Sequence, residues 1–389
     1  MKKKPVLILM VMTMATSFAL LFGHSLTIPN SPKADDEPQQ PLPVARNIRL
    51  ALLLDTSNSM DGLIDQAKSQ LWNIVDEMTE ATHSGVPAEL HLALYEYGND
   101  NLSITSGYVR QVSAFTQDLD EVSRQLFALT THGGSEYCGT VITKSLENMD
   151  WGDDPNDLKF IFIAGNEEFS QGRVPFEKAC ALAVSSDVVV NTIYCGDYRR
   201  GINELWKKGA EVGGGSYMNI DMDKATVYIP SPYDDKIDSL NDVLNKTYIG
   251  YGRHGEANKS RQLREDANAS QLSKENKVKR AITKSKSHAY KNEGWDLVDA
   301  IDKNKVELKN LSDQELPQEM RNMSIAEKEK YLFEQKEKRT AVQTEIQNLA
   351  KLRKNYVQAQ DTTTSNGLER AILKSVKSKA KEKSFEFDN

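Results

Sequence analysis

The fold is decided by one stretch of the chain, residues 49–59, which reads RLALLLDTSNS. Its first part, Arg49–Leu54, is a continuous apolar run, as expected of a β-strand that is buried on both faces of a parallel sheet. Its second part, Asp55–Ser59, is a short polar loop. Apolar residues then recur at helical spacing over Met60–Met78, which predicts a helix with one buried stripe.

The same alternation of strands and helices continues to about residue 250. Further strands are predicted at Glu89–Tyr97, Tyr108–Val112, Leu158–Ala164, Val188–Tyr194 and Tyr217–Ile220. Further helices are predicted at Leu119–Leu129, Gly139–Met149, Pro175–Ser186, Ile202–Val212 and Asp234–Tyr248. This order indicates right-handed crossovers and an α/β fold, a doubly wound, mostly parallel sheet flanked by helices. The ligand site of such a sheet lies at the carboxyl ends of its strands, where Asp55, Gly165–Glu167 and Cys195–Asp197 fall.

The loop Asp55-Thr56-Ser57-Asn58-Ser59 places one carboxylate and two hydroxyls at that edge. These are hard oxygen ligands that suit Mg²⁺, and they are few enough to leave positions for water and for a partner's oxygen. The N-terminus of the following helix is expected to add backbone N–H donors. A second interpretation stays open, in which Ser57 or Ser59 only caps the first turn of the helix.

On these residues, the segment Asn47–Gly250 resembles the von Willebrand factor A domain family. Asp55, Ser57 and Ser59 match the first motif of the family's metal-ion-dependent adhesion site. Three stretches resemble a bacterial exported subgroup, namely YEYGND at 95–100, GGSEYCG at 133–139 and IAGNE at 163–167. The resemblance implies a doubly wound fold and a binding function rather than catalysis. The protein partner would offer an acidic side chain to a divalent cation, Mg²⁺ or else Ca²⁺ or Mn²⁺.

The second motif of the family departs from its usual pattern in this sequence. The family usually has Thr after a pair of glycines, whereas here Gly133-Gly134 is followed by Ser135 and Glu136. Ser135 still offers a hydroxyl, and Glu136 offers a carboxylate that can coordinate directly.

The third motif departs as well, because Gly165 stands where the family has an Asp. Asn166 and Glu167 are the candidates to replace that carboxylate. The loss predicts a weak metal site or a vestigial one. If neither neighbour takes over the role, Gly165→Asp should strengthen metal binding.

The three cysteines, Cys138, Cys180 and Cys195, do not have the spacing of a zinc ribbon. An exported chain can oxidise one pair, and a Cys138–Cys195 disulfide is favoured because both fall near the carboxyl edge of the sheet. Burial of the thiols as small hydrophobic side chains remains the alternative. A Cys138 nucleophile with His132 as its base would instead make the protein a hydrolase.

Composition and charge narrow the class of protein. The chain has 389 residues, of which 39% are hydrophobic and 27% charged, which excludes a collagen, a multi-span membrane protein and a small disulfide scaffold. Residues 1–250 hold 20 Lys and Arg against 34 Asp and Glu. Because phosphate contacts need basic side chains, no nucleic-acid partner is expected.

Residues 1–26 read as a signal peptide or an N-terminal membrane anchor, with Lys2–Lys4 before the apolar run Val6–Phe22. The protein is therefore expected to be exported, either periplasmic or anchored to the inner membrane and facing the periplasm. A linker rich in Pro and Asp follows at 27–46, before the A-like domain at 47–250.

The rest of the chain divides into a polar connector at 251–310, a helical segment at 311–360 and a basic tail at 361–389. Within it, Gln318–Gln358 lacks Gly and Pro and shows a coiled-coil-like seam of about two heptads. The seam around Val342 and Ile346 needs cover, which we expect from Trp295–Ile301 or Leu368–Lys383 of the same chain, and hence a monomer. If the metal site is vestigial, this helical part makes the protein a structural scaffold.

Overall fold

The structure is a computed structural model that describes residues 45–220, 228–360 and 376–387. The chain divides into two compact units, Met1–Leu42 and Pro43–Asn389, and every described residue belongs to the second. The predictions for residues 1–26 and for most of the linker and tail therefore lie outside the described residues. None of the described helices is both long and apolar enough to cross a membrane.

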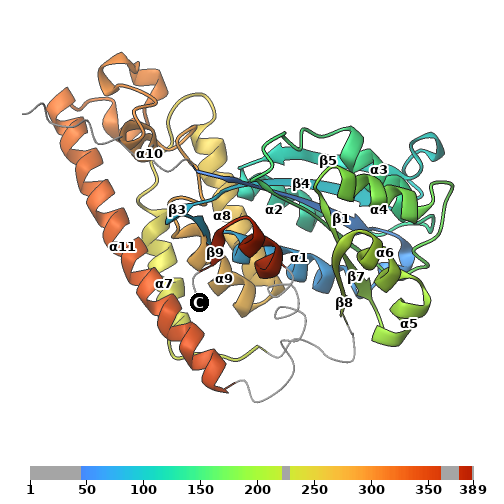
Figure 1. Ribbon diagram of the computed structural model, residues 1–389. Helices are drawn as coiled ribbons and strands as arrows, with labels where there is room; N and C mark the ends of the chain where they lie inside the picture. Colours follow the sequence, from blue (N-terminus) through green and yellow to red (C-terminus); the bar gives the residue numbers. More distant parts are fainter. Residues whose placement is uncertain (1–44, 221–227, 361–375, 388–389) are drawn as a thin grey trace, which may run out of the picture. The chain divides into compact units, whose positions relative to one another are not determined.

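A six-stranded sheet forms the centre of the α/β domain (Figure 1). Its strands lie in the order β5 (Val109–Thr116), β4 (Glu89–Tyr97), β1 (Asn47–Asp55), β6 (Leu158–Gly165), β7 (Val189–Cys195) and β8 (Gly214–Ile220). Only the edge strand β5 runs antiparallel to its neighbour in this sheet. The strand order reverses between β1 and β6, which confirms the predicted doubly wound fold.

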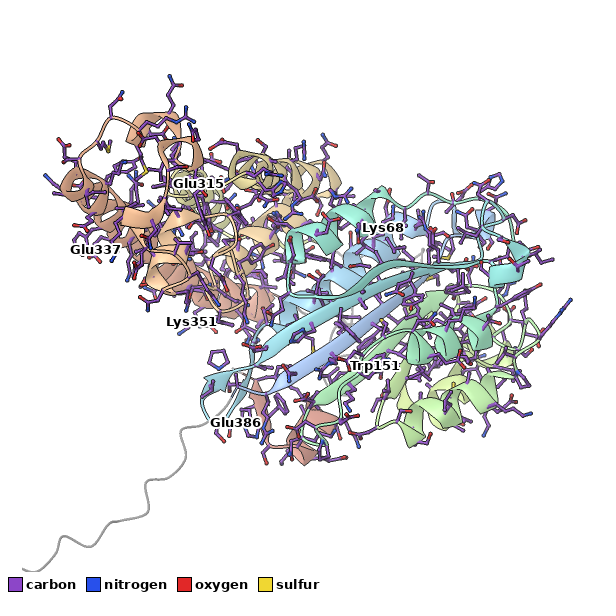
Figure 2. All side chains as sticks on the ribbon, turned by 90° about the horizontal axis from the view of Figure 1, so that it is seen from above. Lys68, Trp151, Glu315, Glu337, Lys351 and Glu386 are labelled. Carbon is purple, nitrogen blue, oxygen red and sulfur yellow. The ribbon has the colours of Figure 1, made fainter. Side chains whose placement is uncertain are left out.

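Helices cover both faces of this sheet (Figure 1). The face that holds Leu50, Leu52 and Leu54 carries α1 (Ile64–Met78) and α2 (Leu119–Ala128). The face that holds Ala51 and Leu53 carries α3 (Cys138–Glu147), α4 (Phe176–Ser185) and α6 (Trp206–Val212), with α5 (Tyr198–Asn203) beside β7 and β8. Figure 2 labels one residue on each face: Lys68 of α1, and Trp151, which packs in the core beside Ala51 and Leu53. Because successive residues of β1 point to opposite faces, its whole apolar run is buried.

A helical region follows the α/β domain. It contains α7 (Asp234–Asn245), α8 (Gly255–Leu272), α9 (Lys274–Lys284), α10 (Leu297–Asp302) and α11 (Ile325–Gln360). Short 3₁₀ turns lie in the α/β domain at η1 (Asn58–Met60) and η2 (Ile104–Ser106), and in the helical region at η3 (Leu308–Asn310), η4 (Asp313–Glu315) and η5 (Gln318–Met320). What the sequence presents as a polar connector at 251–310 is therefore largely helical.

The α/β domain ends earlier than residue 250. The apolar residues Ile237, Leu240 and Leu244 of α7 pack in one cluster with Val342 and Ile346 of α11, not in either core of the sheet. The helical pattern of α7 is visible in the sequence, but such a pattern does not say which element covers its stripe.

Buried ion pairs hold the helical region together and join it to the α/β domain. Arg280 of α9 donates to Asp120 of α2 and to Asp266 of α8, each at 2.7 Å. Arg339 of α11 donates to Asp296 at 2.6 Å. A buried charge is stable only when it is paired with an opposite charge. The charged residues that suggest a solvated connector in the sequence are paired in this way and form a packed interface.

The long helix α11 begins at Ile325, seven residues after the predicted start at Gln318. Its seam residues Val342 and Ile346 are covered from within the chain, by α7 and by Trp295. The predicted segment Trp295–Ile301 thus supplies part of the cover, and α7 is the part that the sequence did not indicate. Monomeric state stays a prediction.

The described end of the tail packs on the α/β domain. Val376, Ala380 and Phe385 belong to the core beside α1. The strand β9 (Phe385–Phe387) pairs with β2 (Ala81–His83), which also pairs with β3 (Val86–Pro87).

Candidate functional site

The loops that follow β1, β4 and β6 meet at the carboxyl edge of the sheet. In the sheet register, Asp55 lies opposite Tyr97 of β4. The loop after β1 is fastened by its backbone, because Thr56 N–H donates to the carbonyl of Tyr97 at 2.8 Å and Asn58 N–H donates to the carbonyl of Gly133 at 2.7 Å. These bonds fix the positions from which the side chains of Asp55–Ser59 project.

Asp55 is fully buried at the centre of this edge. Its Oδ1 accepts the backbone N–H of Ser57 at 2.8 Å. Its Oδ2 is buried and has no hydrogen-bond partner among the described residues. Burial raises the pKa of Asp55 to about 8, although the backbone N–H of Ser57 opposes this shift. A buried carboxylate oxygen without a partner costs about 1–3 kcal/mol, so a ligand that bound Oδ2 would remove that cost.

The hydroxyls of Ser57 and Ser59 form a chain with Asn166. The two Oγ atoms lie 2.8 Å apart, and Ser59 Oγ donates to Asn166 Oδ1 at 2.8 Å. Asn166 Nδ2 in turn donates to the carbonyl of Ser59 at 2.8 Å. The loops after β1 and β6 are thereby joined through side chains.

The capping interpretation of these serines is wrong. Ser57 precedes η1, but its side chain caps neither this turn nor a helix. The helix α1 begins only at Ile64, after Leu63. The expected helix N-terminus is therefore absent from the Asp55–Ser59 loop itself, since η1 and three further residues separate the two.

Glu136 lies next to Asp55, with Gly98 between them. It is 4% exposed. Burial raises the pKa of its carboxyl, and the nearby hydroxyl of Ser57 opposes this shift. A Cβ atom on Gly98 would lie 2.6 Å from Asp55 Oδ1 and 3.1 Å from Glu136 Cγ. Gly98 also has a φ of +80°, which favours glycine. The signal for this position in the sequence is a glycine directly after a predicted strand.

Ser135 and Glu167 contribute less to this arrangement than their neighbours do. Ser135 is half-buried and pairs through its backbone with Gly98. The carbonyl of Glu167 accepts the indole N–H of Trp206 at 2.6 Å, and the charge of its carboxylate helps to raise the pKa of Glu136. The structure therefore gathers Asp55, Ser57, Ser59, Glu136 and Asn166, and leaves these two at the rim.

Gly165 stands where a side chain does not fit. A Cβ atom there would lie 2.5 Å from Tyr97 Oη and 3.1 Å from Asp55 Cβ. Tyr97 is fully buried and donates its hydroxyl to the carbonyl of Ala164 at 3.0 Å. This crowding argues against the expectation that Gly165→Asp strengthens metal binding, because the tyrosine occupies the space that the carboxylate needs.

The expected disulfide between Cys138 and Cys195 is also wrong. All three cysteines are free and buried. Cys195 belongs to the core on one face of the sheet, whereas Cys138 and Cys180 belong to the core on the other. Both positions are close to the carboxyl edge, but the sheet itself separates them.

A hydrolase built on Cys138 and His132 has no support in this geometry. Burial raises the pKa of the Cys138 thiol well above its ordinary value, and its Sγ donates to Tyr97 Oη at 3.8 Å. His132 is exposed. A nucleophilic cysteine needs an accessible thiolate, which burial disfavours here.

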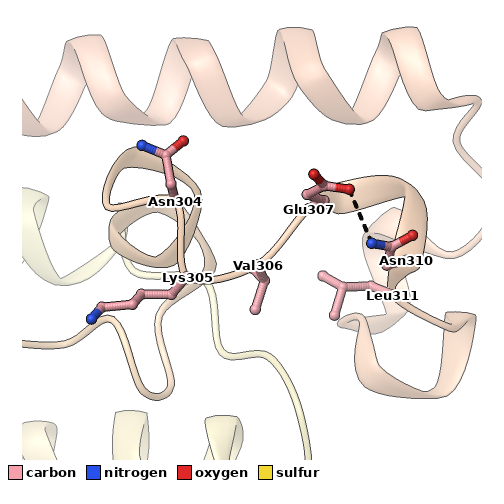
Figure 3. A pocket seen from close by; sticks show the side chains of 6 residues that line it. All are labelled: Asn304, Lys305, Val306, Glu307, Asn310 and Leu311. Carbon is pink, nitrogen blue, oxygen red and sulfur yellow. Dashed lines mark hydrogen bonds between the residues drawn. The ribbon is translucent and has the colours of Figure 1, made fainter.

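The described residues also form a hollow, but no cluster of metal-ligating His, Cys, Asp or Glu side chains. No group of three or more His, Cys, Asp or Glu side chains among these residues could hold a metal ion. A cation at Asp55 would therefore depend on hydroxyl and amide oxygens as well. An open hollow of about 370 Å³ lies in the helical region, lined by residues 304–307, 310 and 311 (Figure 3). Its carboxylate, Glu307, accepts a bond from Asn310 at 3.0 Å, so the hollow offers no cluster of reactive groups.

No protein-family model and no curated protein matches the sequence. Solved structures do match it. The BatB protein of Bacteroides thetaiotaomicron is 14% identical, over 45% of this chain and 91% of its own, with a TM-score of 0.36. The VWA domain of SpRpn10 is 12% identical, over 49% of this chain and 90% of its own, with a TM-score of 0.33. The strand order β5-β4-β1-β6-β7-β8 of this chain is that of a doubly wound sheet, and the structures that match it include a von Willebrand factor A domain.

A third similar structure is proximal thread matrix protein 1 of the mussel byssus, with a zinc-occupied MIDAS motif. It is 12% identical, over 46% of this chain and 43% of its own, with a TM-score of 0.33. The assignment of the fold rests on the strand order and crossovers of this chain. At these identities the likeness extends to no ligand.

Proposed function

We propose that the A-like domain is a binding module that engages a protein partner through a divalent cation. Asp55, Ser57 and Ser59 would hold the cation, with Glu136 and Asn166 as further ligands. The observation that carries the proposal is Asp55 Oδ2, a buried carboxylate oxygen without a partner among the described residues.

The donor set fits such a cation. Two carboxylates, two hydroxyls and an amide oxygen are the hard donors that Mg²⁺, Mn²⁺ and Ca²⁺ prefer. The strongest influences on the pKa values of Asp55 and Glu136 include no Lys or Arg. A cation would thus neutralise two buried acids that the described chain leaves without a positive partner.

The residues of the chain have separate parts in this binding. Asp55 is held rigidly by the sheet and by Ser57 N–H, and it presents Oδ2. Ser59 and Asn166 lock the loops after β1 and β6 at a fixed spacing. A bound divalent cation would supply the positive charge that attracts an acidic side chain of the partner. Such binding is reversible and depends on the metal.

The proposal includes the cellular compartment in which the protein acts. The basic and apolar start of the chain supports export, to the periplasm or to the outer face of the inner membrane. The competing function is a structural scaffold that acts through its helical region. The buried ion pair of Arg280 with Asp120, between that region and the α/β domain, suits either function.

Metal-dependent capture from envelope extracts separates the two. Immobilised full-length protein is expected to retain its partner in Mg²⁺ and to release it in EDTA. Asp55→Ala should abolish capture. Asp65→Ala is the matched control, because this carboxylate lies on α1 with a side chain that is 73% exposed. Capture that survives both EDTA and Asp55→Ala would favour the scaffold.

A further inference from the structure

The position of Glu136 suggests that the chain carries its own version of the partner's acidic group. We infer that Glu136 is an internal substitute ligand, whose carboxylate occupies the cation's position for the partner until the partner's acid displaces it. This inference rests on the proposed function. It concerns how the same site is regulated and what a partner must do to enter.

The geometry places Glu136 beside Asp55. The two side chains approach each other across Gly98, where a Cβ atom would lie 2.6 Å from Asp55 Oδ1 and 3.1 Å from Glu136 Cγ. Glu136 also lies close enough to the hydroxyl of Ser57, one of the proposed ligands, for this hydroxyl to lower the pKa of its carboxyl. A second carboxylate thus lies among the proposed ligands. It is close to the hydroxyl of Ser57, which a partner's acid would also approach.

Glu136 is built to be displaced more easily than Asp55. Asp55 ends a strand whose neighbours pair on both sides, so its backbone is fixed. Glu136 lies in the irregular segment before α3, after Gly133 and Gly134. Its carbonyl accepts Cys138 N–H at 3.2 Å. A rotation of this side chain would leave the sheet and α3 in place.

Charge balance explains why the partner's acid would displace Glu136 from the cation. Asp55 and Glu136 together supply two negative charges, which one divalent cation neutralises. A third carboxylate, from the partner, would add a negative charge to a buried and already neutral site, which is costly. The partner's acid is therefore expected to replace Glu136 rather than to join it.

Rescue by a small acid tests this inference on the full-length protein. Mn²⁺ affinity is measured by calorimetry, with and without acetate, for the wild type, Glu136→Ala and Glu136→Gln. Glu136→Ala should weaken Mn²⁺ binding by about tenfold or more, because it removes a ligand. Acetate should restore affinity in this variant, since it fits the vacated position. Acetate should not improve Mn²⁺ binding to the wild type, where Glu136 already fills that position.

Controls and outcomes are distinct. Glu168→Ala removes an exposed carboxylate that accepts a bond from Ser170, and it should leave Mn²⁺ affinity unchanged. Glu136→Gln keeps the shape of the side chain, so a loss of affinity in a variant with wild-type melting cannot be a folding defect. Wild-type affinity in Glu136→Ala, or weakened binding that acetate does not restore, would overturn the inference and leave the proposed function standing. If the wild type itself binds no Mn²⁺, the proposed function fails and the inference fails with it.

Discussion

Replacing Gly165 should destabilise the fold instead of improving the metal site. The added Cβ of Gly165→Ala would lie 2.5 Å from Tyr97 Oη, 3.0 Å from the Trp206 ring and 3.1 Å from Asp55 Cβ. Tyr97 cannot simply turn away, because it is fully buried and its hydroxyl donates to the carbonyl of Ala164.

The size of the effect follows from two terms. Overpacking a well-filled core by one methyl group costs about 1–3 kcal/mol. Displacing the Tyr97 hydroxyl from its carbonyl partner adds about 1 kcal/mol. Gly165→Ala should therefore lower the free energy of unfolding by about 2–4 kcal/mol. Gly165→Asp should lower it further, because it also buries another carboxyl beside those of Asp55 and Glu136.

Urea unfolding of four proteins measures this: the wild type, Gly165→Ala, Tyr97→Phe and the double variant. Tyr97→Phe removes the atom that the new methyl group meets first. The double variant should therefore be more stable than the sum of the single effects predicts, by about 1 kcal/mol or more. Additive effects, or a Gly165→Ala protein within about 0.5 kcal/mol of the wild type, would refute the crowding argument.

Three further predictions concern the helical region. Arg280→Met should lower the free energy of unfolding by about 3–5 kcal/mol, because it leaves Asp120 buried without a positive partner. Arg124→Ala is the control, since Arg124 pairs with Glu121 at an exposed position, and it should cost less than about 1 kcal/mol when both variants are compared by urea unfolding. Burial opposes the shift, but the charges of Lys284 and Arg280 hold the pKa of Asp266 below its ordinary value. Its stabilisation is therefore complete above about pH 4 and is lost as the pH falls towards the folded-state pKa, so Asp266→Asn should flatten the acid side of a stability–pH curve. Ile346→Ala should lower the free energy of unfolding by about 2–5 kcal/mol, and Leu352→Ala should lower it much less, because Leu352 is 48% exposed. A peptide of residues 318–358, which lacks α7, should be mostly coil by circular dichroism. Equal costs of the two substitutions, or a helical peptide, would contradict the assignment of α7 as the cover of α11.

The sequence predicted the α/β domain well, because its signals are local. The apolar run before Asp55 is short and ends in a polar loop, which favours a strand buried on both faces, and the apolar residues after it recur at helical spacing. The carboxyl-edge rule then brought Asp55 and Asn166 to one place, where Ser59 Oγ now lies 2.8 Å from Asn166 Oδ1.

What the sequence missed depends on contacts between distant residues. The residues around 251–310 look solvated because their charges are visible, whereas their pairing with Asp120 is not. The two cysteines near the carboxyl edge lie on opposite faces, which only the register of β7 and the start of α3 determine. Gly165 reads as a lost ligand, but the Tyr97 hydroxyl that fills its space comes from another strand.

The central claim is that Asp55 holds a divalent cation, and a calorimetric titration of the full-length protein with Mn²⁺ and Mg²⁺ tests it most directly. The wild type should bind one cation, and Asp55→Ala should bind none while its circular dichroism spectrum and melting remain those of a folded protein. Equal affinities of the two proteins for either cation would contradict the claim.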